Sequence, residues 1–142
     1  MSSSTNLKKN DIPAIQVVAL ALRRELDGRY LVTRRGPGQS GAGEWEFPGG
    51  KLEPCESQKQ ALKREIEEEL GFSLEEQKLL FVAENSHHYP NKSIQLFLWS
   101  LSLNVIPEII LTEHDQLQWC HASEMHTLGL SQADRPFIDQ LK

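Results

Sequence analysis

One helix is marked at both ends in the sequence, and it concentrates acidic side chains on one face. Ser57 is a typical N-cap and Gly71 a typical left-handed stop, so the pattern predicts a helix that ends at Leu70. At 100° per residue, three apolar side chains share one stripe, and three carboxylates lie within a roughly 100° arc beside it. The apolar set is Leu62, Ile66 and Leu70, and the acidic set is Glu65, Glu68 and Glu69.

The acidic arc requires a compensating positive charge. Like charges three or four residues apart on a helix cost roughly 0.2–0.5 kcal/mol per pair. Arg64 stands one turn before Glu68 and can pair with it, whereas Glu67 points away and is expected to be solvated. A solvated charged surface is the plainer interpretation of such a helix, but here the signs do not alternate. Because Mg²⁺ binds carboxylate oxygens together with phosphates, the arc predicts a metal site that serves phosphate chemistry.

The rest of the chain predicts a mixed β-sheet. Runs of β-branched and aromatic residues indicate strands, and segments rich in glycine and proline separate them. The predicted strands are residues 14–22, 30–35, 45–47, 79–89, 93–103 and 116–121. A final helix is expected to begin at Ser131 and to run through Ile138 and Leu141, with Pro136 in its first turns. Strands and helices do not alternate regularly, so we predict an α/β fold with a mixed β-sheet sandwiched between helices.

Composition and charge exclude two classes of partner. The 142 residues, 39% of them hydrophobic, predict one domain over residues 1–142, with residues 1–12 as a flexible tail. A formal net charge of -5 without a basic stripe argues against binding a nucleic-acid polymer. No apolar run is long enough to span a bilayer. Cys55 and Cys120 are isolated, which predicts reduced thiols and a cytoplasmic protein.

The acidic helix belongs to a longer spaced motif. From Gly50 the chain runs five residues to Glu56, and seven more residues lead to REIEEELGF at 64–72. This pattern resembles the Nudix box, GX5EX7REUXEEXGU with U apolar, at every fixed position. So many fixed residues make the motif far more specific than a lone glycine-rich loop. Three further stretches resemble the MutT branch, the nucleoside triphosphate pyrophosphohydrolases: VTRR at 32–35, WEFPGGKLE at 45–53 and ADRPFIDQLK at 133–142.

The resemblance implies a Nudix-type fold and a metal site centred on the helix. The implied ligands of Mg²⁺, or of Mn²⁺, are the Gly49 carbonyl, Glu56, Glu65, Glu68, Glu69 and, as a distal ligand or base, Glu113. Metal-activated water then attacks a phosphorus and releases nucleoside monophosphate and pyrophosphate. Glu65 and Glu113 both remain candidates for the general base. Arg64 is expected to orient the neighbouring glutamates. An ordinary pair between Arg64 and Glu68 and a solvated loop acid at Glu113 are the plainer interpretations.

The resemblance also implies how the nucleotide is bound. Arg35 and Lys51 are candidates for phosphate contacts, although each is equally well interpreted as a solvated cation. Asp134 falls where MutT has an asparagine that reads 8-oxoguanine. An ionised aspartate only accepts hydrogen bonds and suits the amino group of cytosine, whereas a protonated one restores recognition of 8-oxoguanine. Asp134 is also interpretable as an acid that stabilises a helix N-terminus.

These residues predict an enzyme and leave its substrate open. We predict a MutT-like Nudix hydrolase that cleaves a nucleoside triphosphate, with 8-oxo-dGTP narrowly ahead of CTP or a modified dCTP. A hydrolase of nucleoside diphosphate sugars, of the ADP-ribose type, and a non-catalytic nucleotide-binding domain are the alternatives. The expected partner is the nucleotide, and both a monomer and a homodimer are compatible with the sequence.

Overall fold

The computed structural model describes residues 14–141, so the predicted tail at residues 1–12 lies outside the described residues. The strands are β1 (Ala14–Arg24), β2 (Arg29–Arg35), β3 (Trp45–Glu46), β4 (Gly49–Lys51), β5 (Leu80–Tyr89), β6 (Lys92–Leu103) and β7 (His114–Cys120). The helices are α1 (Gln58–Leu70) and the short 3₁₀ helices η3 (Glu76–Lys78), η4 (Ala122–Thr127) and η5 (Arg135–Gln140). In this part of the chain, no helix is long and apolar enough to cross a membrane.

The seven strands form one mixed sheet. Its main path has the order β3-β2-β1-β6-β5, while β4 pairs with β1 and β7 pairs with β2. β1 and β6 run parallel along their whole length, and the other strand pairs are antiparallel. The predicted mixed sheet of an α/β fold is therefore confirmed.

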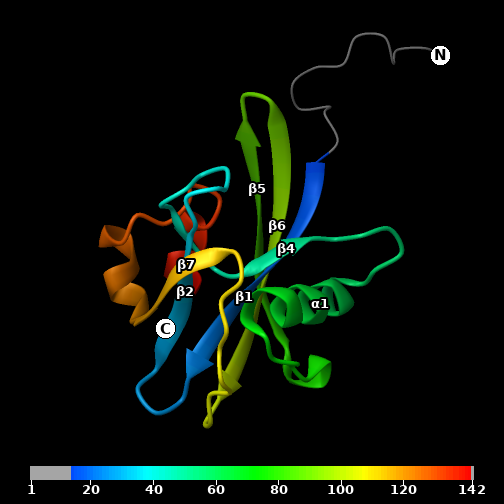
Figure 1. Cartoon of the computed structure of the whole chain (residues 1–142). Helices are drawn as coiled ribbons and strands as arrows, with labels where there is room; N and C mark the ends of the chain where they lie inside the picture. The colour runs from blue at the N-terminus through cyan, green and yellow to red at the C-terminus, as the bar shows by residue number, and fades with distance from the viewer. Residues whose placement is uncertain (1–13, 142) are drawn as a thin grey trace, which may run out of the picture.

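Each face of the sheet carries its own apolar core. Figure 1 shows α1 and the C-terminal helical turns on opposite sides of β1. On one face the stripe of α1, formed by Leu62, Ile66 and Leu70, is fully buried, as the helical period predicts. On the other face the two short helices η4 and η5 contribute Met125 and Phe137 to the second core. The sheet is thus covered by an α-helix on one side and by short helical turns on the other.

The predicted bounds of α1 are confirmed by its two caps. The Ser57 hydroxyl accepts the Gln60 N–H at 3.1 Å, and the Gln60 side chain accepts the Ser57 N–H at 2.9 Å, which completes a capping box. Gly71 ends the helix with a φ of 79°, a left-handed conformation that glycine adopts without a steric penalty. Local sequence therefore fixes where the acidic face begins and ends.

The predicted helix from Ser131 to Leu141 is wrong. A turn follows Ser131, and only the 3₁₀ helix η5 forms, with bonds such as Phe137 N–H to the Asp134 carbonyl at 3.0 Å. Pro136 has no N–H, so it cannot supply the i to i−4 bond that an α-helix needs here. Asp134 is consequently the residue before a short 3₁₀ helix, and its side chain makes no capping hydrogen bond.

Strand β4 was not predicted, because its glycines indicated a break. Gly49 and its neighbours pair with β1, where Gly49 faces Ala19 and Lys51 faces Val17. A Cβ on Gly49 would collide with the carbonyl oxygen of Val18, so only glycine allows this close approach of two strands. This close approach brings the segment Gly49–Gly50, called the glycine segment below, into contact with α1.

Candidate active site

The glycine segment and α1 are fitted to each other. The Gly49 N–H donates to Glu69 Oε1 at 3.1 Å. A Cβ on Gly50 would overlap the carboxyl group of Glu65, so the absence of a side chain makes room for that carboxylate. The structure thereby brings together Gly49, Glu65 and Glu69, which the sequence pattern assigned to one site.

Arg64 is the centre of the charged contacts on α1. Its guanidinium binds Glu56 through two hydrogen bonds of 2.7 and 2.9 Å and reaches Glu65 Oε2 at 3.1 Å. It lies 3.7 Å from Glu68 Oε2 and donates to the Lys51 carbonyl at 3.0 Å. The Arg64 hydrogen bonds hold the pKa of Glu56 down at about 2, with a further contribution from the Glu53 N–H. Arg64 thus links the loop before α1 to three of the glutamates.

Two carboxylates of the site are costly to ionise in the absence of a cation. Burial, followed by the charges of Glu46 and Glu65, raises the pKa of Glu69 to about 8. Burial also raises the pKa of Glu65, against the opposing effect of Arg64, and the charges of Glu68 and Glu113 add to the rise. A nearby cation would favour the charged form of each group.

The donor set fits a hard divalent cation. Within residues 14–141, no three Asp, Glu, His or Cys side chains converge tightly enough to hold a metal as they stand. Arg64 donates hydrogen bonds to Glu56 and Glu65, and the Gly49 N–H donates one to Glu69. The available donors are nevertheless carboxylate oxygens on one helix face and at its margin, which is the chemistry that Mg²⁺ prefers.

Glu113 lies at the margin of this acidic site. It precedes β7, its side chain is exposed, and its charge contributes to the raised pKa of both Glu65 and Glu69. Beside it, Thr112 donates its hydroxyl to the carbonyl of Glu68 at 2.9 Å. The structure therefore brings the distal acid to the helix from a segment more than forty residues away.

Two residues near the site had no role in the sequence prediction, namely Glu46 and His114. Glu46 Oε1 accepts from Arg35 Nη1 at 2.9 Å, and Glu46 Oε2 lies 2.9 Å from His114 Nε2. The ring of His114 is buried, and its Nδ1 is the one buried side-chain nitrogen or oxygen among the described residues without a hydrogen-bond partner. Leaving such an atom unpaired costs about 1–3 kcal/mol. The sequence placed Glu46 only in the predicted strand WEF at residues 45–47 and gave no indication of a role for His114.

The two candidate phosphate-binding cations differ in their surroundings. Arg35 is turned toward Glu46 and donates its Nε to the Ser40 carbonyl at 2.6 Å, so its guanidinium is engaged within the protein. Lys51 is exposed and lines a pocket of about 450 Å³ formed by residues 14–16 and 51–56. Glu56 lines the same pocket, which places Lys51, and not Arg35, at an open margin of the acidic site.

Asp134 is buried away from α1, with its carboxylate held by two donors. Its Oδ2 accepts the Ser131 hydroxyl at 2.9 Å and the Phe47 N–H at 3.3 Å. Burial raises its pKa to about 7, the charge of Glu46 adds to the rise, and the two hydrogen bonds oppose it. Glu46 therefore influences both Asp134 and Glu69, and so connects the two acids electrostatically.

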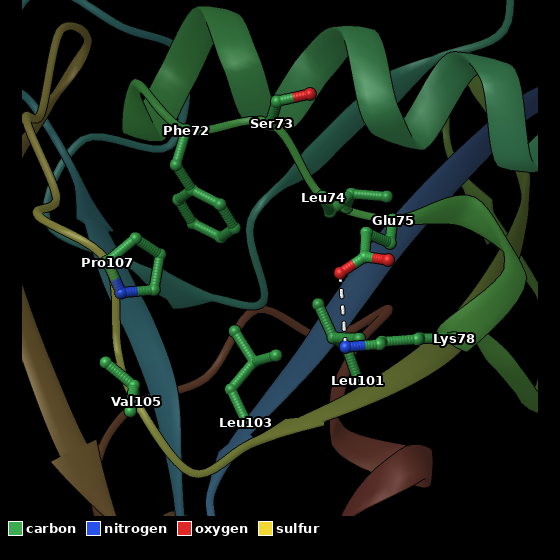
Figure 2. A pocket seen from close by; sticks show the side chains of 9 residues that line it. All are labelled: Phe72, Ser73, Leu74, Glu75, Lys78, Leu101, Leu103, Val105 and Pro107. Atoms are coloured by element: carbon green, nitrogen blue, oxygen red, sulfur yellow. Dashed lines mark ion pairs between the residues drawn. The ribbon is translucent and has the colours of Figure 1, made fainter.

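A second pocket, of about 240 Å³, is formed by other residues. Figure 2 shows Phe72, Leu103 and Val105 around it, with the Glu75–Lys78 ion pair of 3.1 Å at one side. None of the predicted site residues lines this pocket.

Comparison with known proteins identifies the family. The model of the NUDIX domain matches residues 14–141. The CTP pyrophosphohydrolase of Escherichia coli is 38% identical over 129 residues, 88% of this chain and 89% of that protein. An 8-oxo-dGTP diphosphatase of Haemophilus influenzae is 40% identical over 89 residues, 63% of each chain.

Solved structures agree with this assignment. The solution structure of the E. coli ORF135 protein has a TM-score of 0.77 at 35% identity and covers 92% of this chain and 90% of its own. The crystal structure of the MutT protein of Methanosarcina mazei has a TM-score of 0.80 at 25% identity, with 92% and 94% covered. The chain belongs to the Nudix family. It is a MutT-like Nudix hydrolase and a pyrophosphohydrolase, which confirms the predicted class of enzyme.

Proposed function

We propose that this hydrolase converts a nucleoside triphosphate into nucleoside monophosphate and pyrophosphate, with cytidine nucleotides preferred. The observation that carries the proposal is the pairing of a carboxylate face on α1 with a separate buried acid, Asp134. The carboxylate face can bind a cation that carries phosphates, and Asp134 can form hydrogen bonds with the edge of a nucleotide base. 8-oxo-dGTP, narrowly preferred on the sequence alone, becomes the second candidate.

In this proposal Mg²⁺, or Mn²⁺, is held by the Gly49 carbonyl and by the carboxylates Glu56, Glu65, Glu68, Glu69 and Glu113. The bound ion would lower the pKa of water and neutralise charge on the phosphates. The raised pKa values of Glu65 and Glu69 support the assignment, because these groups are stabilised in their charged form by a cation. Arg64 orients Glu56 and Glu65 through its short hydrogen bonds and needs no contact with the substrate.

Water attacks one phosphorus, the P–O bond between the α- and β-phosphates breaks to release nucleoside monophosphate and pyrophosphate, and a carboxylate accepts the proton of the water. Glu65 and Glu113 remain the candidates for this base. Arg64 already occupies one oxygen of Glu65, which favours Glu113 as the free acceptor. Lys51 is the better candidate for a phosphate contact, since the guanidinium of Arg35 is bound to Glu46.

Two observations support a cytidine nucleotide. An ionised Asp134 only accepts, and the exocyclic amino group of cytosine donates. The relative named CTP pyrophosphohydrolase matches 88% of this chain, whereas the 8-oxo-dGTP diphosphatase of H. influenzae matches 63%. One observation favours 8-oxo-dGTP as the second candidate: the pKa of Asp134 is raised to about 7, so a protonated carboxyl group is accessible near neutral pH and can donate.

The first experiment resolves the products of 8-oxo-dGTP, dGTP, CTP, dCTP and ADP-ribose with Mg²⁺, with Glu68→Gln as the control. Monophosphate and pyrophosphate from CTP or dCTP, lost in the control, would support the proposal. Cleavage of ADP-ribose alone would favour a sugar-nucleotide hydrolase, and no turnover would favour a non-catalytic binding domain.

The pH dependence of the ratio of kcat/KM for CTP to that for 8-oxo-dGTP separates the two base candidates. Effects on the metal site cancel in this ratio, so it reports on base recognition. If the ionised Asp134 binds cytosine, the ratio rises with pH through about 7. In Asp134→Asn the ratio should be flat, and a slope unchanged by this substitution would contradict the role of Asp134.

The proposal also covers the setting of the enzyme. We propose that residues 1–142 act as one Nudix domain on free nucleotides, as a monomer or homodimer in the cytoplasm. The net charge of -5 supports a substrate other than a nucleic-acid polymer. Cys55 and Cys120 are both free thiols, which is compatible with a reducing compartment.

A further inference from the structure

A buried histidine stands directly beside Glu113. His114 begins β7, and its side chain is 1% exposed. Its Nε2 is 2.9 Å from Glu46 Oε2, and because an ionised carboxylate only accepts, the ring nitrogen is the donor. The buried Nδ1 has no hydrogen-bond partner among the described residues, so the hydrogen bond at Nε2 orients the ring.

A β-bulge places this ring inside the protein. In the pairing of β2 with β7, Arg34 faces Gln116 but Arg35 faces His114, so Asp115 is an extra residue. Asp115 forms two hydrogen bonds of 2.8 Å to the guanidinium of Arg34 at the surface. An inserted residue reverses the alternation of side chains, which explains why His114 is buried while Gln116 is exposed. Bulges that redirect a side chain are common beside active sites.

The partner of His114 is itself held in place. Glu46 Oε1 accepts from Arg35 Nη1 at 2.9 Å, so both oxygens of this carboxylate are bound. Arg35 in turn donates its Nε to the Ser40 carbonyl at 2.6 Å. Glu46 is therefore a fixed acceptor against which the ring of His114 is oriented.

Glu113 is anchored through both of its neighbours. On one side, the Thr112 hydroxyl donates to the Glu68 carbonyl on α1 at 2.9 Å. On the other side, His114 binds Glu46. The backbone of Glu113 is also packed closely against Gly36, where a Cβ would lie 2.7 Å from the Glu113 carbonyl oxygen. An exposed carboxylate is thus carried by a short segment whose ends are both fixed.

We propose that His114 is a positioning residue, which holds the carboxylate of Glu113 beside Glu65 and Glu69 through its hydrogen bond to Glu46. Thr112 completes the arrangement from the side of α1. This inference rests on the proposed function, because Glu113 acts there as a metal ligand or base. It adds a residue that touches neither the metal nor the nucleotide and acts through the placement of Glu113.

The test is a double-mutant cycle measured by Mn²⁺ binding to the nucleotide-free protein, using isothermal titration calorimetry. We expect His114→Leu to weaken Mn²⁺ binding about 10-fold and to lower kcat by a similar factor with little change in KM. His114→Gln is the matched control, since its amide N–H can donate to Glu46, and it should retain most of the affinity. In a Glu113→Gln background, His114→Leu should cause no further loss.

Several outcomes would overturn the inference. They are undiminished Mn²⁺ binding in His114→Leu, an equal loss in His114→Gln, and a loss of the same size in the Glu113→Gln background. If His114→Leu does not fold, Thr112→Val tests the other anchor of Glu113. Thr112→Val should weaken Mn²⁺ binding, and this loss of affinity should vanish in the Glu113→Gln background. A loss of affinity that persists in that background would overturn the inference.

Failure of the proposed function would look different. Coupling in Mn²⁺ binding without hydrolysis of any triphosphate would contradict the proposed function and support the positioning role. Hydrolysis of a triphosphate without coupling between His114 and Glu113 would support the proposed function and contradict the positioning role.

Discussion

Glu69 and Asp134 are both buried acids near Glu46, yet the protein stabilises their charge in different ways. Burial is the largest cause of the raised pKa of each, about 8 for Glu69 and about 7 for Asp134, and the charge of Glu46 is the second. Asp134 accepts two hydrogen bonds and has Glu44 as one additional negative neighbour. Glu69 accepts one hydrogen bond and has two additional negative neighbours, Glu65 and Glu113. Because both acids are buried, hydrogen-bond donors and like-charged neighbours together distinguish the acid suited to a cation, Glu69, from the acid suited to a base, Asp134.

The largest effect should follow from replacing Glu69. We expect Glu69→Gln to lower kcat with Mg²⁺ at least about 100-fold, because a proposed ligand is lost. Without metal the same variant should be more stable than the wild type near pH 8, since the charge repelled by Glu46 and Glu65 is gone. Steady-state kinetics and urea unfolding in chelator measure the two effects. Full activity in Glu69→Gln would remove the distinction between the two acids.

Asp134, the second of the two buried acids, should make the free energy of unfolding depend on pH. Its folded pKa of about 7 lies above 3.8, the ordinary value of an aspartate, so its stabilising contribution is complete below pH 3.8 and is lost as the pH rises through 7. Asp134→Asn has no such titration. Its stability relative to the wild type should therefore rise by about 1.4 kcal/mol per pH unit between these limits. Urea unfolding from pH 4 to 8 in chelator checks this slope, and parallel curves would contradict it.

Added metal should act on one acid only. Mg²⁺ competes with the proton on Glu69, so stabilisation by saturating Mg²⁺ should grow by about 2 kcal/mol between pH 6 and pH 8, or roughly 6 °C in Tm. The growth should be smaller in Glu69→Gln, where Glu65 still competes for the proton, and unchanged in Asp134→Asn. Thermal unfolding with and without Mg²⁺ measures it, and an altered response in Asp134→Asn would show that the two acids are not separate.

The smallest effect concerns the backbone of the loop before α1, where charge plays no part. Cys55 has a φ of 67°, a left-handed conformation that costs an ordinary residue about 1–2 kcal/mol. Cys55→Gly relieves this cost but adds unfolded-state entropy, so we expect stabilisation of at most about 1 kcal/mol. Turnover should be retained. Urea unfolding measures the gain, and a clear loss of stability would show that the thiol itself makes a favourable contact.

Sequence reasoning succeeded where the physical signal is local. The capping box at Ser57, the stop at Gly71 and the buried stripe of α1 follow from neighbouring residues, and the structure confirms them. Every strand except β4 was found for the same reason, since β-branched runs and turns are local patterns. The final helix failed because Pro136 limits the last segment to 3₁₀ hydrogen bonds.

The residues of the site also fall into those placed by local sequence and those placed by tertiary structure. By itself, the sequence determined that Glu65, Glu68 and Glu69 share a face of α1, because a helical period of 3.6 residues sets their directions. Only the tertiary structure decided that Glu113 reaches this face, that the charge of Glu46 acts on both Glu69 and Asp134, and that His114 is buried. Those placements depend on β2 pairing with β7 across a bulge and on β4 pairing with β1. Such pairings join residues far apart in the chain, and no local period encodes them.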